Sequence, residues 1–214
     1  MTGSGLIDIF VVGLVSYLAG AIPFSYIAGR VFGRIDLRRE GSGNLGASNT
    51  FRLLGGRIAL VVLAADVAKG FIPVIVAPGL ASSGVVTREG LMLTAAFFAI
   101  IGHMFSVFVS FAGGKGVATT AGAFLALSPW ALLATLVVFA GVFAVKRIVS
   151  LASVTCAIVF PIAVFILDRA GLAEARWPLV AASVVISLVV LFKHRDNIKR
   201  LVRGEERVLQ RIKR

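Results

Sequence analysis

The sequence has few of the residues from which disulfides, metal sites and soluble surfaces are built. Its 214 residues include one cysteine, Cys156, and two histidines, His103 and His194. A lone cysteine inside an apolar run excludes a disulfide framework and a thiolate metal site. Charged residues make up 15% of the chain, whereas a soluble domain has about 25%. We therefore expect no metal, no cofactor and no soluble fold.

Apolar residues are instead abundant, at 58% of the chain. Several apolar runs approach the length of about 20 residues that a helix needs to cross a bilayer. This composition predicts an all-α polytopic membrane protein, with residues 1–214 forming one integral-membrane domain. The N-terminal run lacks the basic region and the cleavage site of a signal peptide, so we expect it to be retained as a span.

Seven transmembrane helices are predicted, at 5–30, 57–79, 89–111, 116–127, 129–146, 149–168 and 177–193. The nearly continuous apolar stretch 117–145 is divided at Ser128 and Pro129, because serine suits a helix N-cap and proline suits the first helical position. The fourth span is then too short to cross alone, so it has to be tilted, shielded by neighbours or bordered by a thinned bilayer.

The net charge of +12 would indicate nucleic-acid binding in a soluble protein. Here it is better explained by membrane topology, so we expect no nucleic-acid partner. Most of the 22 Lys and Arg residues fall in alternate loops and in the C-terminal tail, except Lys69, Arg88, Arg169 and Arg176. Because cytoplasmic loops carry an excess of Lys and Arg, the N-terminus is predicted to lie outside and the C-terminus in the cytoplasm.

Four polar clusters lie on the predicted cytoplasmic side. The first is EGSGNLGASNTFR, residues 40–52, in which glycines free the backbone around Arg52. Exposed amides beside an arginine are a common way to cradle an anion. An ordinary cytoplasmic turn explains the composition equally well. The side chains that offer hydrogen-bond donors here are Ser42, Asn44, Ser48, Asn49 and Thr50.

The second cluster, SFAGGKGVATT at residues 110–120, places Lys115 among three glycines. A lysine in a glycine loop that opens a helix indicates phosphate binding, because amides and the helix dipole point at the anion. It is not a Walker A loop, since Val109 and Gly116 stand where that motif needs Gly and Ser or Thr. A flexible turn with a topogenic lysine is the alternative.

The last two clusters belong to the C-terminal half. In KRIVSLAS, residues 146–153, Ser150 is predicted to cap the sixth span, with Ser153 one turn further along. Residues 193–214 are predicted to form a basic amphipathic cytoplasmic tail, interpreted as an amphipathic helix on an anionic membrane surface. His194 and Asn197 share one helical face there. A plain basic anchor explains the lysines and arginines, but it does not explain His194 and Asn197.

Polar residues also occur inside two predicted spans. Asp66 and Lys69 are three residues apart in the second span and are expected to pair, which lowers the cost of burying them. We favour a structural or substrate-orienting pair over a proton relay. His103 in the third span is expected to have a hydrogen-bonded structural role rather than to bind a ligand.

Together the clusters suit the binding of one or two phosphates. Acyltransferases with a His-x4-Asp motif are excluded, because Phe108 and Lys199 stand where the aspartates are required after His103 and His194. An enzyme with this inventory needs a donor that arrives already activated.

At these residues the chain resembles the acyl-phosphate:glycerol-3-phosphate acyltransferase family (PlsY) of bacterial inner membranes. The motifs that carry the resemblance are SGNLGASNTFR, GHMFSVFVSFAGGKGVATT and HRDNIKRLVRGEE, with DVAKG and RIVSLAS as further signatures. They cover essentially the whole chain in the family's order. The chain departs from the family at Ser106, where proline is usual, and at Ala112, where a lysine is usual. The second departure removes one positive charge from the expected anion site.

The resemblance implies a seven-helix enzyme of the bacterial cytoplasmic (inner) membrane with its active site on the cytoplasmic side. It would transfer a fatty acyl group from acyl phosphate to the 1-hydroxyl of sn-glycerol 3-phosphate, giving lysophosphatidic acid and phosphate, the first step of bacterial phospholipid synthesis. Those substrates and membrane lipids are its expected partners, and the oligomeric state stays open. The alternative is a phosphate or organophosphate transporter. A basic membrane anchor for partner proteins would leave the glycine loops unexplained.

The catalytic residues that the resemblance implies are Lys115, Arg52, Ser42, His194, Asn197 and Ser153. The residues expected to bind substrate or phosphate are Gly113, Gly114, Gly116, Asn44, Asn49 and Ser150, with Ser153 favoured over Ser150 as the family's serine. Acyl phosphate is a mixed anhydride, so catalysis reduces to positioning and charge stabilisation. Either the donor's phosphate or His194 takes the hydroxyl proton.

Overall fold

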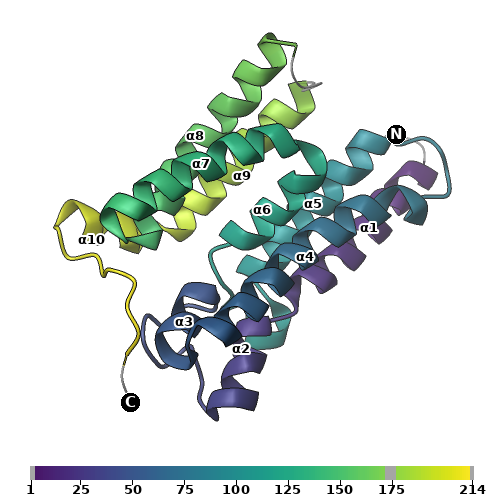
Figure 1. Cartoon of the computed structure of the whole chain (residues 1–214). Helices are drawn as coiled ribbons and strands as arrows, with labels where there is room; N and C mark the ends of the chain where they lie inside the picture. Colours follow the sequence, from purple (N-terminus) through teal and green to yellow (C-terminus); the bar gives the residue numbers. More distant parts are fainter. Residues whose placement is uncertain (1–2, 172–176, 213–214) are drawn as a thin grey trace. The chain divides into compact units, whose positions relative to one another are not determined.

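The computed structural model describes residues 3–171 and 177–212, and every regular element in these ranges is helical (Figure 1). The chain divides into two compact units, residues 1–127 with 211–214 and residues 128–210, and each is described by itself.

The first unit holds the N-terminal helices. They are α1 (Gly3–Ala21), α2 (Phe24–Ala28), α3 (Ala47–Leu54), α4 (Gly56–Leu80), α5 (Arg88–Met104) and α6 (Val117–Leu127). A π-helical turn, Gly29–Gly33, follows α2, and a 3-10 turn, Val107–Val109, follows α5. Helix α1 packs along α5, and α4 packs against both α5 and α6.

Glycines allow these helices to approach closely. A Cβ atom added at Gly20 or Gly102 would overlap a backbone carbonyl of the facing helix in the α1–α5 pair, and the same holds for Gly70 and Gly122 in the α4–α6 pair. Small residues at such contacts are typical of helix packing in membranes. The two helices that flank the glycine loop, α5 and α6, are therefore each fixed against a long neighbour.

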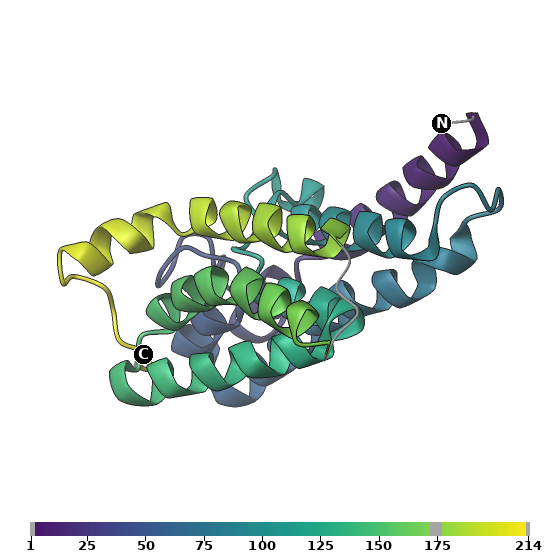
Figure 2. The same ribbon diagram turned by 90° about the horizontal axis from the view of Figure 1, so that it is seen from above.

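The second unit consists of α7 (Pro129–Lys146), α8 (Val149–Arg169), α9 (Trp177–Lys193) and α10 (Arg195–Val202). Helix α8 packs against α7 and α9, and Figure 2 shows these three helices running alongside one another. Helices α9 and α10 meet at an angle of 64°. The bend falls at His194, which is the residue before α10.

Five helical segments in the described ranges are long and apolar enough to cross a membrane, or six if α9 and α10 are counted as one bent span. Helix α6 is a shorter apolar helix. The long helices expose large apolar side chains in both units, which soluble proteins rarely do over wide areas. Examples are Phe10, Leu60, Val61, Val137, Val145, Ile166 and Leu188. The fold is thus that of an all-helical membrane protein.

Each predicted span overlaps at least one helix, and α7 and α9 begin and end at the predicted residues. Three boundaries were wrong. The first span is interrupted at Ile22 and Pro23, because proline lacks an amide and restricts the residue before it. The third helix ends at Met104 rather than at residue 111. The tail is helical only to Val202, because Gly204 takes a left-handed conformation with φ of +71°.

The predicted serine caps also need correction. Ser128 does precede α7, and Pro129 is its first residue, but the buried Ser128 hydroxyl has no hydrogen-bond partner among the described residues. Ser150 is not a cap. The residue before α8 is Ile148, which places Ser150 within the first turn of the helix.

Candidate active site

The first polar cluster is folded around one buried amide side chain. Asn49, in α3, accepts a hydrogen bond from the Ser42 backbone amide at 2.8 Å and donates to the carbonyls of Leu37 at 3.0 Å and Glu40 at 3.1 Å. It is 1% exposed. A side-chain amide used in this way stabilises a turn. Asn49 therefore shapes the backbone around Ser42, a role that sequence reasoning did not assign to it.

Apolar and charged contacts also hold the loop that contains Ser42. Leu37 and Leu45 are buried with Leu53 and Val109 in one apolar cluster. Asp36 pairs with Arg38 at 2.7 Å, and the Arg38 guanidinium lies 4.9 Å from the centre of the Tyr26 ring. The Arg38 hydrogen bond holds the pKa of Asp36 at about 2. The loop conformation is thus fixed by packing as well as by charge.

Arg52 lies in the last turn of α3. The carbonyl of Arg52 accepts a hydrogen bond of 2.9 Å from the backbone amide of Ile212, near the C-terminus. Gly55, whose φ is +87°, ends α3, and the Arg211 guanidinium lies beside it. The C-terminal segment is therefore tied to the helix that carries Arg52. Sequence reasoning missed this contact because nothing in the tail pattern indicates a partner.

The glycine loop is held against the first cluster. A Cβ atom added at Gly114 would overlap the Leu45 carbonyl and the His103 ring, and one at Gly113 would overlap the His103 carbonyl. The Gly114 amide donates to the His103 carbonyl at 3.0 Å. Two clusters that are far apart in the sequence thus meet where Leu45 approaches Gly114.

These contacts give the glycines of the loop a role in packing. Gly113 and Gly114 permit close packing, and the amide of Gly114 is already engaged by His103. Gly116, with φ of +83°, starts the turn from which α6 begins, and its carbonyl accepts from the Thr120 amide at 2.7 Å. Lys115 is half-buried between Gly114 and Gly116, two residues before α6 begins at Val117. The loop places a lysine at a helix N-terminus, which favours anions.

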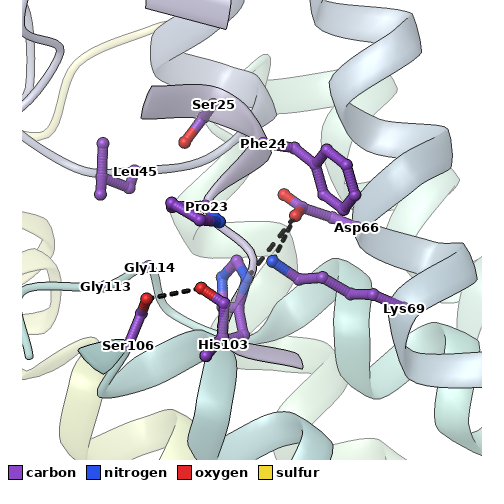
Figure 3. A pocket seen from close by; sticks show the side chains of 11 residues that line it. Pro23, Phe24, Ser25, Leu45, Asp66, Lys69, His103, Ser106, Gly113 and Gly114 are labelled. Carbon is purple, nitrogen blue, oxygen red and sulfur yellow. Dashed lines mark hydrogen bonds and ion pairs between the residues drawn. The ribbon is translucent and has the colours of Figure 1, made fainter. Parts of the chain in front are cut away.

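A cluster of buried polar side chains lies beside the glycine loop (Figure 3). Asp66 and Lys69 form the predicted ion pair at 2.8 Å, and His103 Nδ1 lies 3.7 Å from the Asp66 carboxylate. These side chains line a small cavity together with Ser25, Ser106 and the glycines Gly113 and Gly114. The cavity therefore borders the loop that precedes Lys115.

The second unit holds the other predicted residues: His194 and Asn197 lie at the bend between α9 and α10, and Ser150 and Ser153 lie near the start of α8. His194 is 2% exposed and its Nδ1 lies 2.8 Å from the Val190 carbonyl. A carbonyl can only accept, so Nδ1 carries hydrogen and Nε2 is the basic nitrogen of the neutral ring. Ser153 donates to the Val149 carbonyl of its own helix at 2.9 Å.

Sequence reasoning also missed a carboxylate in this unit. Glu206 accepts from Asn197 at 2.8 Å and from Arg200 at 2.7 Å. Burial acts to raise the pKa of Glu206, but the hydrogen bonds of Asn197 and Arg200 outweigh it and lower the pKa. Ser150 lies near enough to add to this effect, although its hydroxyl makes no hydrogen bond of good geometry. The sequence signal for this contact was an acidic residue, Glu206, within a basic tail.

The predicted site residues therefore fall into two groups. Ser42, Asn44, Asn49, Arg52 and the loop Gly113–Gly116 belong to the first unit, and Ser150, Ser153, His194 and Asn197 to the second. In the described ranges, no three His, Cys, Asp or Glu residues are grouped so that they could hold a metal ion.

Comparisons with known proteins point to one activity. A family model described as glycerol-3-phosphate acyltransferase matches residues 10–204. A relative from Geotalea daltonii, named glycerol-3-phosphate acyltransferase, is 41% identical over 197 residues, which are 92% of this chain and 95% of the relative.

Two crystal structures of PlsY, described as an integral membrane glycerol 3-phosphate acyltransferase, have the same fold. The glycerol 3-phosphate form matches with a TM-score of 0.82 and 36% identity, over 94% of this chain and 96% of that chain. The lysophosphatidic acid form matches with a TM-score of 0.77 and 35% identity, over 96% and 95%.

Proposed function

Because this chain belongs to the glycerol-3-phosphate acyltransferase family, we propose that it transfers a fatty acyl group from acyl phosphate to the 1-hydroxyl of sn-glycerol 3-phosphate. The hydroxyl oxygen attacks the acyl carbonyl carbon, the bond from that carbon to the phosphate oxygen breaks, and the hydroxyl proton leaves with the phosphate or with a base. The products are lysophosphatidic acid and inorganic phosphate. The observation that carries the proposal is the close approach of the Leu45 carbonyl to Gly114, which brings together the two segments that we propose to bind anions.

In the first unit, Lys115 and Arg52 are the cations of the proposed site. Lys115 precedes the N-terminus of α6, so its ammonium group and the helix dipole both favour a phosphate. Arg52 adds a planar guanidinium suited to phosphate oxygens. Ser42 and Asn44 lie on the loop that Asn49 shapes, and we assign them hydrogen bonds to substrate.

In the second unit, we assign roles in the reaction to His194, Asn197 and Ser153. The Nδ1 contact with Val190 directs basicity to Nε2, so His194 is suited to accept the hydroxyl proton. The donor's phosphate is the other acceptor, and it needs no protein base. A general base acts only when it is deprotonated, so a His194 base should make kcat/KM fall at low pH, and loss of this acidic limb in His194→Gln would favour His194.

We further propose seven spans in a bacterial inner membrane, with the N-terminus outside and the active site on the cytoplasmic side. The distribution of Lys and Arg supports this sidedness. Helix α6 is short for a span, and its close glycine contacts with α4 supply the shielding that it needs.

Purified protein incubated with palmitoyl phosphate and glycerol 3-phosphate tests the function. We expect release of phosphate and of lysophosphatidic acid in equal amounts. Lys115→Ala and Arg52→Ala should each abolish the reaction, whereas Arg57→Ala, which removes an exposed arginine at the start of α4, should not. Near-normal turnover of a folded Lys115→Ala variant would overturn the assignment.

The transporter alternative is tested with proteoliposomes. Transport would appear as uptake of labelled glycerol 3-phosphate in the absence of acyl phosphate. We expect no such uptake, and we expect labelled lipid only when acyl phosphate is added.

A further inference from the structure

At the break between α1 and α2, two backbone carbonyls accept hydrogen bonds from side chains of other segments. Where α1 ends, the carbonyl of Ile22 accepts a hydrogen bond from Lys69 Nζ of α4 at 2.7 Å. The carbonyl of Ala21 accepts from the Ser106 hydroxyl, which follows α5. Figure 3 shows Lys69 and Ser106 pointing toward this break from different elements. Buried carbonyls at the end of a helix need such partners.

Lys69 is in turn fixed by Asp66. Both side chains are almost fully buried, at 5% and 2% exposed. Separation of the two charges would leave each of them buried without a partner, which is strongly unfavourable. The pair is therefore held together. The Lys69 ammonium also lies 5.5 Å from the centre of the Phe24 ring, just beyond the break.

His103 connects this pair to the glycine loop. Its Nδ1 faces the Asp66 carboxylate at 3.7 Å, and its ring fills the space that a Gly114 side chain would occupy. Its carbonyl accepts from the Gly114 amide at 3.0 Å. One residue therefore contacts the buried carboxylate with its ring and the loop with both ring and backbone. Lys115 follows Gly114 directly.

We propose that Asp66, Lys69 and His103 are positioning residues that hold the Lys115 loop in place. The ion pair fixes the position of the His103 ring, and His103 fixes Gly114. None of the three needs to touch substrate. The inference rests on the proposed role of Lys115 in binding phosphate.

A displaced loop would move the Lys115 ammonium away from the phosphate while leaving its charge in the protein. Errors of about 1 Å in positioning can cost on the order of 100-fold in rate. Because phosphate binding is affected first, we expect the KM for the phosphate-bearing substrates to rise more than kcat falls.

Kinetics of three variants test the proposal. His103→Ala should lower kcat/KM about 10-fold or more, mainly through KM, and His103→Asn should restore part of the loss because it keeps a polar group near Asp66. The double variant Asp66→Leu with Lys69→Met removes both charges at similar volume. Such replacements often preserve folding, and a melting transition kept by the double variant would show that a raised KM does not reflect unfolding.

Asp8→Asn is the matched control. Asp8 is also 2% exposed in α1, but its carboxylate accepts from the amides of Ser82 and Ser83 in the loop between α4 and α5. It lies 13 residues before Ala21, or about 20 Å along the helix. We expect Asp8→Asn to lower the melting temperature without changing KM.

The outcomes separate this inference from the proposed function. If Lys115→Ala is inactive while the His103→Ala and double variants keep the KM of Asp8→Asn, the positioning role is wrong and the function stands. If Lys115→Ala is itself active, the proposed function fails, and the positioning role fails with it.

Discussion

Asn197 is oriented by Glu206: its side-chain amide donates to one carboxylate oxygen at 2.8 Å, and the other oxygen accepts from Arg200 at 2.7 Å. The chain turns back at Gly204, which brings Glu206 onto α10. A predicted site residue is thereby held by an acidic residue nine positions further along the chain. The orientation of Asn197 depends on a charge that lies in the tail.

Glu206→Gln is expected to loosen this arrangement. The amide retains the shape of the carboxylate but loses its charge and one acceptor oxygen. Hydrogen bonds to charged groups contribute about 1.5–3 kcal/mol, so the melting temperature should fall by a few degrees and acyl transfer should weaken. Thermal unfolding in detergent and initial rates measure both effects. Glu205→Gln, at the exposed neighbouring position, serves as the control, and equal effects of the two variants would contradict the prediction.

The same carboxylate predicts a pH dependence. Burial opposes ionisation of Glu206, but the hydrogen bonds of Asn197 and Arg200 outweigh it, so its folded-state pKa lies below 4.5. A lowered carboxyl pKa stabilises the fold above the unfolded-state pKa and loses that contribution as pH falls through the folded-state value. The difference in melting temperature between the natural protein and Glu206→Gln should be constant from pH 7 to about 5 and shrink below that. A difference that does not change with pH would exclude the charge as its cause.

Gly114→Ala should abolish acyl transfer, because its Cβ would overlap the backbone carbonyl of Leu45, which cannot move like a side chain. Gly141→Ala in α7 is the matched control, since nothing lies within 4 Å of the added Cβ. Alanine is more stable than glycine inside a helix by about 0.5–1 kcal/mol, so this control should keep activity and unfold at the same or a higher temperature. Activity and melting temperature are measured for both variants, and an active Gly114→Ala protein would contradict the prediction.

The sequence predicted the helices well because long apolar runs bounded by charge and proline require little tertiary information. It did not predict the break at Pro23, because a proline near a span end is compatible with either a kink or a stop. It identified Lys115 and Arg52 as candidates from residue type. It could not show that Asn49 shapes a loop or that Gly114 packs on Leu45, since such contacts depend on approaches between distant segments.

The structure gives a role to Ser106, the position where the family resemblance leads us to expect proline. Its hydroxyl bonds to the carbonyl of Ala21, and its φ is −70°, which lies within the range that proline fixes. Ser106→Ala should therefore destabilise the protein by about 1–3 kcal/mol, the cost of a buried acceptor left without a partner. Ser106→Pro loses the same bond but restricts the unfolded chain, so it should be less destabilised than Ser106→Ala. Denaturation midpoints measured in the same detergent compare the two, and the reverse order would contradict the explanation.

Ile212→Pro tests whether the C-terminal segment supports Arg52. Proline removes the amide that donates to the Arg52 carbonyl, whereas Ile212→Ala removes the side chain and keeps that amide. A backbone hydrogen bond contributes about 0.5–1.5 kcal/mol, which corresponds to a change of roughly 2- to 10-fold. We expect Ile212→Pro to raise the KM for glycerol 3-phosphate by such a factor and Ile212→Ala to have a smaller effect. The family match ends at residue 204, so Ile212 lies outside the matched region. Equal KM values for the two variants would show that the amide has no part in holding Arg52.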